Sequence, residues 1–216
     1  MKSIRPKVRF LIAITAMISF FIALLYDCYF LRIVSKPIPI LVFLSLLNFK
    51  SHYSKFIFIG LLFSMIGDIL LEVSNQLFIM GLISFLIAHI NYITAFVGRS
   101  KKLNLLPALI LLMLGSLLFL LLLPKLHTLM PAVLIYLIVI LIMAWRAIAQ
   151  ANFDNYAKYA ALGAIIFIIS DSLIAIDKFY APLSHIRWII MPTYWTAQAL
   201  IFLSAFKSQK KNKLTI

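Results

Sequence analysis

The sequence predicts an all-α integral membrane protein, a polytopic bundle of eight transmembrane helices with both termini cytoplasmic. Three observations support this fold class. Of the 216 residues, 64% are hydrophobic and only 12% are charged. The apolar residues gather in long runs, and the basic residues stand in short blocks between those runs. A soluble domain of this size cannot bury so much apolar surface, so the bilayer must be the main solvent.

Eight apolar runs follow one another along the chain, each a candidate to cross the hydrocarbon core. They cover residues 10–31, 37–49, 55–74, 77–97, 103–123, 131–150, 157–177 and 187–206. The second run is short and starts at Pro37, which suits a first helical turn because its missing N–H would be unpaired there. Since the connections are short, we expect one domain over residues 1–216, with basic cytoplasmic tails at 1–9 and 207–216.

The basic residues are distributed unevenly between the two sides of this arrangement. If the N-terminus is cytoplasmic, the inner segments carry 15 of the 20 lysine and arginine residues. Such a bias marks the cytoplasmic side, and an even number of spans returns the C-terminus to that side. This excess of basic residues on one side, together with the short loops, favours a multi-pass protein of a bacterial inner membrane.

Several function classes are excluded by the composition. The net charge of +14 could suggest nucleic acid, but short basic blocks between apolar runs are typical of cytoplasmic loops and contacts with anionic lipid. Cys28 is the only cysteine, so neither a disulfide within the chain nor a cysteine metal site is expected. A phosphate loop and a serine nucleophile elbow are both absent from the sequence. We expect no metal and no cofactor, and the sequence carries no signal for an oligomeric state.

At least three of the six acidic residues are predicted to lie within the membrane, namely Asp68, Glu72 and Asp171. A carboxylate in hydrocarbon is costly, so it usually faces a cavity or a partner and marks function. Asp68 and Glu72 are four residues apart and share one helix face. Asp68 and Asp171 lie 13 and 14 residues from the cytoplasmic starts of their runs, a rise of about 20 Å each. The two aspartates are therefore predicted at similar depth, facing each other.

Two interpretations of these carboxylates remain open. Facing carboxyl groups can form an acid–base pair in which one is protonated and the other ionised, as in glycosidases. Alternatively, buried carboxylates can pair with lysine or histidine and simply hold the bundle together. Further polar residues lie at or near the same level, with a packing role as the alternative for some of them. They are Lys36, His89, Ser170, Tyr194 and Gln198. Tyr92 and Tyr136 are interpreted as core or lipid-facing aromatics.

At these residues the chain resembles the YhhN-like family of integral membrane lysoplasmalogenases. The matching positions, in chain order, are Lys36, Pro37, Ser64, Met65, Ile66, Gly67, Asp68, Gly81, Phe85, His89, Tyr92, Pro131, Tyr136, Gly163, Ala164, Phe167, Ser170, Asp171, Tyr194, Trp195 and Gln198. Each piece is weak alone, but their order on successive helices is fairly specific. They extend over most of the chain.

The resemblance implies an eight-helix fold that hydrolyses the vinyl ether bond of lysoplasmalogens. The substrates would be a 1-alkenyl lysophospholipid and water, and the products a fatty aldehyde and a glycerophospho-ethanolamine or glycerophospho-choline. It also implies that Asp68 and Asp171 are the catalytic pair. We expect Glu72 to support that pair, and Lys36 to contact the substrate phosphate. His89, Ser170, Tyr194 and Gln198 are expected in supporting roles, such as positioning water.

A function of another class also fits the pattern. A small proton-coupled transporter would need buried carboxylates at one depth as well. Transport predicts uptake that depends on a proton gradient, whereas a hydrolase predicts aldehyde release in detergent. The sequence alone favours the hydrolase.

Overall fold

In the computed structural model, residues 6–214 are described, with side chains described to residue 208. Regular structure in this part of the chain is entirely helical. The α-helices are α1 (Pro6–Leu25), α2 (Tyr29–Ser35), α3 (Ile38–Leu46), α4 (His52–Val73), α5 (Phe78–Val97), α6 (Leu105–Leu126), α7 (Met130–Ala149), α8 (Ala157–Ala175) and α9 (Arg187–Leu214). Short helical turns are η1 (Asn75–Leu77), η2 (His127–Leu129) and η3 (Ile176–Tyr180). Of the predicted tails, residues 1–5 and 215–216 lie outside the described residues, and the described backbone of both tails is mostly helical.

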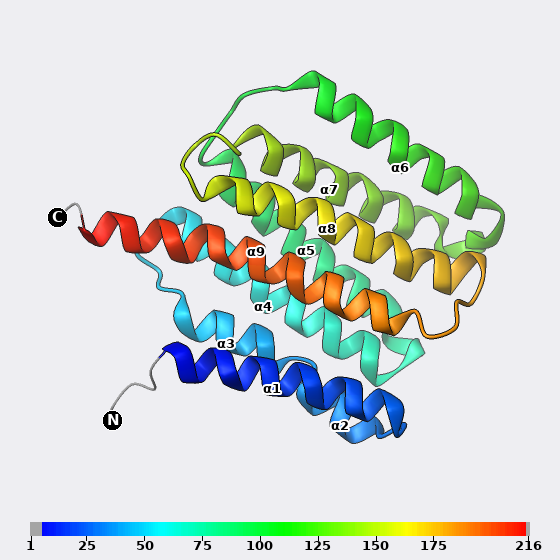
Figure 1. Ribbon diagram of the computed structural model, residues 1–216. Coiled ribbons are helices and arrows are strands. Elements are labelled where there is room, and N and C mark those ends of the chain that lie inside the picture. Colours follow the sequence, from blue (N-terminus) through cyan, green and yellow to red (C-terminus); the bar gives the residue numbers. More distant parts are fainter. Residues whose placement is uncertain (1–5, 215–216) are drawn as a thin grey trace.

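The long helices lie side by side in one bundle (Figure 1). The most extensive contacts join α4 to α5 and α8 to α9, and α4 also packs on α9. Helices α6 and α7 extend one flank, while α1, α2 and α3 form the other. Close packing in the centre depends on small residues: at Gly60 and Gly67 of α4, an added Cβ would run into Tyr92 and Phe85 of α5.

Seven helical stretches of the described chain are long and apolar enough to cross a membrane. The stretch Leu105–Ala149 has 45 residues and contains two predicted runs, 103–123 and 131–150. It divides into α6 and α7, which η2 joins and which pack on each other. Many leucine side chains of α6 are exposed at the surface of the bundle, as expected for contact with lipid. The chain is therefore an integral, multi-pass membrane protein.

The predicted boundaries hold for the later runs but were wrong for the first two. The run 10–31 was predicted as one helix, yet α1 ends at Leu25 and α2 starts at Tyr29. Asp27, with φ of 49°, has the left-handed conformation that ends helices. The second stretch starts at Tyr29 rather than at Pro37. Because Pro37 has no N–H to donate, it instead separates α2 from α3.

Polar contacts close the end of the bundle where α1 begins and α9 ends (Figure 1). The guanidinium of Arg99 lies 3.2 Å from the ring centroid of Tyr53. Its Nη2 is 3.6 Å from an oxygen of Asp154 and donates to Ser208 Oγ at 3.0 Å. Burial lowers the pKa of Arg99 from its usual range. These contacts tie α4, the α7–α8 connection and α9 together, which leaves the opposite end for a site.

The packing of α8 on α9 gives a testable prediction. A Cβ at Gly163 would lie 2.8 Å from the backbone oxygen of Ala197, which cannot move without moving α9. We expect Gly163→Ala to lower the free energy of unfolding by about 1–3 kcal/mol, measured by unfolding in mixed micelles. The matched control is Gly98→Ala, because Gly98 is exposed and has ordinary helical φ and ψ. A Cβ there would first meet the exposed side chain of His52, at 3.2 Å, and that side chain can move. Equal midpoints for the two variants would contradict the close α8–α9 contact.

Candidate active site

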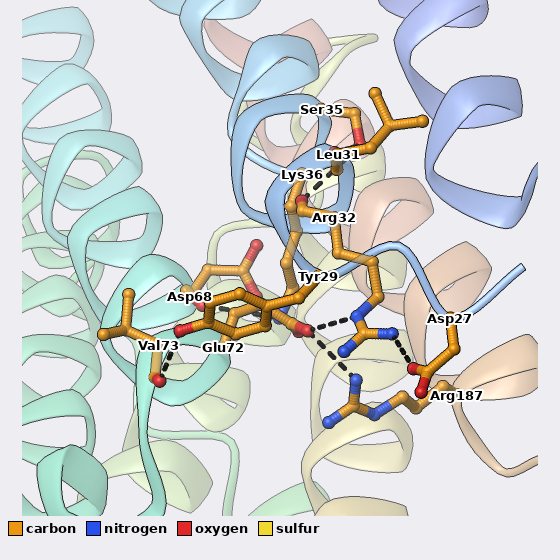
Figure 2. A network of polar contacts seen from close by, with 10 residues as sticks. All are labelled: Asp27, Tyr29, Leu31, Arg32, Ser35, Lys36, Asp68, Glu72, Val73 and Arg187. Carbon is orange, nitrogen blue, oxygen red and sulfur yellow. Dashed lines mark hydrogen bonds and ion pairs between the residues drawn. The ribbon is translucent and has the colours of Figure 1, made fainter. Parts of the chain in front are cut away.

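The polar stripe predicted on α4 faces the centre of the bundle. Asp68 and Glu72 lie one helical turn apart, and both are buried. Lys36, from the break between α2 and α3, inserts its ammonium between them (Figure 2). Its Nζ lies 3.0 Å from Asp68 Oδ1 and 3.1 Å from Glu72 Oε2, and it donates to the backbone oxygen of Asp68 at 3.3 Å. The other oxygen, Asp68 Oδ2, is buried without a hydrogen-bond partner.

Glu72 is the anion on which three cations meet. Besides Lys36, it accepts from Arg32 Nε at 3.1 Å and from Arg187 Nη1 at 3.0 Å (Figure 2). Arg32 also pairs with Asp27 at 2.6 Å, although the Asp27 side chain is 93% exposed. The Glu72 carboxylate therefore connects α4 to α2 and to the start of α9, at the end of the bundle opposite to the Arg99 contacts.

Asp171, on α8, has a different set of partners. It accepts a hydrogen bond from the hydroxyl of Tyr136 on α7. The same Tyr136 oxygen lies 3.0 Å from His89 Nε2, which is itself 3.9 Å from Asp171 Oδ2. Since Tyr136 gives its proton to Asp171, its oxygen must accept from His89, and Nε2 must carry a hydrogen. His89 Nδ1 is buried without a partner.

The remaining predicted residues line the space between α4, α5, α8 and α9. The hydroxyl of Tyr194 donates to the backbone oxygen of Ser64 at 3.3 Å. Gln198 accepts from Tyr92 at 2.8 Å, while its Nε2 is buried without a partner. Ser170 donates to the backbone oxygen of Ile190 at 3.3 Å, a contact between α8 and α9. Ser170 therefore has a helix-packing contact, and Tyr194 and Gln198 belong to a buried polar cluster.

Two neighbouring cavities lie beside these residues. The first, of about 180 Å³, contains most of the charged groups, and we refer to it as the polar cavity. It is lined by Phe20, Lys36, Asp68, Leu71, Glu72, Phe78, Phe85, Ile174, Asp177, Lys178, Arg187, Ile190, Met191 and Tyr194. The second, of about 80 Å³, is the apolar cavity. Its lining is hydrophobic side chains of α4 to α8 and η3, with Asp171, Ser172 and Tyr136 as its polar members.

The two cavities share a wall made of Leu71, Phe78, Phe85 and Ile174. Asp68 lines the polar cavity and Asp171 the apolar cavity, so each aspartate borders a different side of this wall. Among the described residues, no hydrogen bond joins the two carboxyl groups. The prediction that they face each other directly was too simple, because each has its own partner from another helix.

The structure brings all eight residues that were predicted for the site into this region. Three further residues were missed by sequence reasoning: Tyr136, Arg32 and Arg187. The two arginines were counted only as charges of the outer loops, and nothing in their spacing placed them on Glu72. Tyr136 was interpreted as a packing aromatic because it stands alone in an apolar run. Its place in the family resemblance was the one signal that could have marked it.

Comparison with known proteins identifies the family of the chain. Residues 31–205 match the sequence model of the YhhN family. Lysoplasmalogenase TMEM86A of Bos taurus is 38% identical over 161 residues, which are 71% of this chain and 66% of the relative. Lysoplasmalogenase TMEM86B of Homo sapiens is 34% identical over 176 residues, which are 80% of this chain and 74% of the relative. The chain thus matches just under two thirds of the length of the bovine relative. No solved structure is detectably similar.

The charge cluster on Glu72 gives a prediction about stability. Glu72→Gln removes the anion shared by three cations, two of which are largely enclosed. Breaking a buried ion pair typically costs about 3–5 kcal/mol, so the midpoint of thermal unfolding in detergent should fall clearly. Asp27→Asn is the matched control, because it removes an exposed partner of the same Arg32 and exposed pairs contribute little. A similar midpoint for both variants would mean that Glu72 does not hold the cluster together.

Proposed function

The chain belongs to the YhhN family, and from that premise we propose that it is a membrane-embedded hydrolase of lysoplasmalogens. It cleaves the vinyl ether bond of 1-alkenyl-glycerophospho-ethanolamine or 1-alkenyl-glycerophospho-choline. The products are a fatty aldehyde and the glycerophospho head group. The curated relatives are lysoplasmalogenases by name, which supports this reaction.

The same proposal includes the topology. With α6 and α7 as separate spans, the seven apolar stretches of the described chain make eight crossings. The excess of lysine and arginine then places the start of α1 and the end of α9 in the cytoplasm. The membrane is the inner membrane of a bacterium, as short loops and basic ends favour.

The observation that carries the proposal is the meeting of two cavities of opposite polarity, of which one is lined by Asp68 and the other by Asp171. In a lysoplasmalogen the vinyl ether bond joins a polar glycerophosphate to an apolar alkenyl chain. With the head group in the polar cavity and the chain in the apolar cavity, that bond lies at the shared wall. Asp68 and Asp171 then flank it from the two sides.

The mechanism follows from the chemistry of vinyl ethers. A proton adds to the enol carbon and leaves an oxocarbenium ion, to which water adds. The resulting hemiacetal releases the aldehyde and the glycerol hydroxyl, and the proton returns to the site. Such a reaction needs a positioned acid and a nearby anion, as in glycosidases. It requires neither a metal nor a nucleotide.

We assign the acid to Asp68 and the anion to Asp171. The unpaired Oδ2 of Asp68 has room to carry a proton, while its Oδ1 still accepts from Lys36. Asp171 accepts a hydrogen bond from the Tyr136 hydroxyl, so that carboxyl oxygen acts as an acceptor rather than as a proton donor. It can therefore stabilise the oxocarbenium ion and accept a proton from the attacking water. Glu72 keeps Lys36 in place, and Tyr194 and Gln198 position the enol ether and water.

The first prediction from this mechanism concerns the aspartates. Asp68→Asn and Asp171→Asn should each lower aldehyde release from 1-alkenyl lysophospholipid by at least about 100-fold, the usual contribution of general acid–base catalysis. The measurement uses detergent-purified protein. Asp154→Asn serves as control, because Asp154 caps α8 at the other end and asparagine can also cap a helix.

Near wild-type turnover by either aspartate variant would refute the carboxylate pair. Detergent micelles hold no proton gradient, so aldehyde release there also separates hydrolysis from proton-coupled transport. Uptake into vesicles that needed Asp68 or Asp171, without aldehyde release, would favour the transporter.

A second prediction concerns Tyr136, a positioning residue that acts through Asp171. Tyr136→Phe removes the hydroxyl that donates to Asp171 and accepts from His89. A hydrogen bond to a charged group contributes about 1.5–3 kcal/mol, so kcat should fall by roughly tenfold or more. Since Tyr136 borders the apolar cavity without contacting the head group, KM should change little. Tyr53→Phe, which removes a buried hydroxyl at the closed end, should leave kcat intact. A loss confined to KM would contradict the role of Tyr136.

A further inference from the structure

The polar cavity has two cations at its rim that are exposed. Arg187 is the first residue of α9, and half of its side chain is exposed. Lys178 lies on η3, is also exposed, and has its ammonium 4.2 Å from the ring centroid of Phe78. Both line the polar cavity. Arg187 contacts Glu72 through Nη1 only, which leaves the rest of its guanidinium free to donate.

The two other cations that contact Glu72, Lys36 and Arg32, are enclosed rather than exposed. The side chains of Lys36 and Arg32 are only 7% and 13% exposed. Lys36 is held by two carboxylates, and Arg32 is held by Glu72 and Asp27 (Figure 2). Lys36 cannot turn toward a new anion without leaving the buried Asp68 unpaired, which is costly. Arg32 is occupied by two carboxylates and does not line the polar cavity. A negatively charged ligand that enters the polar cavity therefore meets Arg187 and Lys178 first.

The spacing along α4 matches the spacing within a glycerophospholipid. Glu72 is one turn beyond Asp68, a rise of about 6 Å, and Arg187 is bound to Glu72. In the lipid, five bonds separate the vinyl ether oxygen from the phosphorus, which is about 6 Å in an extended chain. A substrate with its vinyl ether oxygen at the level of Asp68 thus brings its phosphate to Arg187.

We propose that Arg187, assisted by Lys178, binds the phosphate diester of the lysophospholipid substrate. The proposal rests on the proposed function and names the head-group site of the same cavity. It moves the phosphate contact from Lys36, where the sequence suggested it, to the rim, and leaves Lys36 to hold Asp68 and Glu72. Asp177 lines the same cavity, so the rim also carries a carboxylate that complements the ammonium of the head group.

Binding can be measured without turnover by using saturated ethers. A 1-alkyl lysophosphoethanolamine has no enol carbon to protonate, and 1-alkylglycerol of the same chain length lacks the phosphate. Dissociation constants are measured with detergent-purified full-length protein. For Arg187→Gln, we expect affinity for the phospholipid ether to fall about tenfold or more and affinity for alkylglycerol to change less than twofold. Lys178→Gln should have a smaller effect of the same kind, and Arg187→Lys should restore part of the affinity.

The matched control is Lys125→Gln. Lys125 is an exposed cation in the last turn of α6, at the same end of the bundle, and it lines neither cavity (Figure 1). It should leave both affinities unchanged. Equal losses for the two ethers in Arg187→Gln would mean a structural role, and unchanged affinity would overturn the site outright. If inorganic phosphate alone bound with the same dependence on Arg187, the site would serve a free anion rather than a lipid.

Turnover separates this proposal from the proposed function. Suppose that Arg187→Gln loses affinity only for the ether that carries a phosphate, and that the wild type releases no aldehyde. That result would support the phosphate site and refute the hydrolase. Aldehyde release by the wild type with an unchanged KM in Arg187→Gln would keep the hydrolase and refute the site.

Discussion

The ammonium of Lys36 between Asp68 and Glu72 is the interaction on which the rest of the site depends. Two buried carboxylates one turn apart repel each other, and a cation between them makes the arrangement tolerable in a membrane. Lys36 reaches them because Pro37 interrupts the second helical stretch at that level. Glu72 can then gather Arg32 and Arg187 as well. The helix break at Pro37, the ion pairs of Glu72 and the start of α9 are thus linked by direct contacts.

Much of this organisation could be predicted from the sequence. Long apolar runs indicate where the helices lie. The few carboxylates within those runs indicate the candidate site, because a carboxylate is costly to bury in a membrane. The first helix boundary was missed because an apolar count does not register the left-handed turn at Asp27. Equal depth of Asp68 and Asp171 was inferred from helical rise, but rise gives no rotation about the axis. The partners Tyr136 and Arg187 come from packing between distant segments, which one sequence does not encode locally.

The two interpretations left open for the carboxylates turn out to be compatible. Asp68 and Glu72 pair with a lysine, as the structural interpretation required, while Asp68 Oδ2 remains free beside a cavity. Asp171 is held by a neutral hydroxyl instead of a cation. The two aspartates therefore differ in their surroundings, and different surroundings are how similar carboxyl groups acquire different tasks.

The polar cavity opens at the end of the bundle opposite to the one that Arg99, Tyr53 and Asp154 close. A bundle fixed in a bilayer presents that open end to a single leaflet. If the proposed function is correct, lipids of that leaflet can enter with the head group already at the correct height, whereas lipids of the other leaflet must first flip across the membrane. The position of this cavity would thus restrict the proposed enzyme to lipids of one leaflet, and its activity would depend on the supply of lipid to that leaflet.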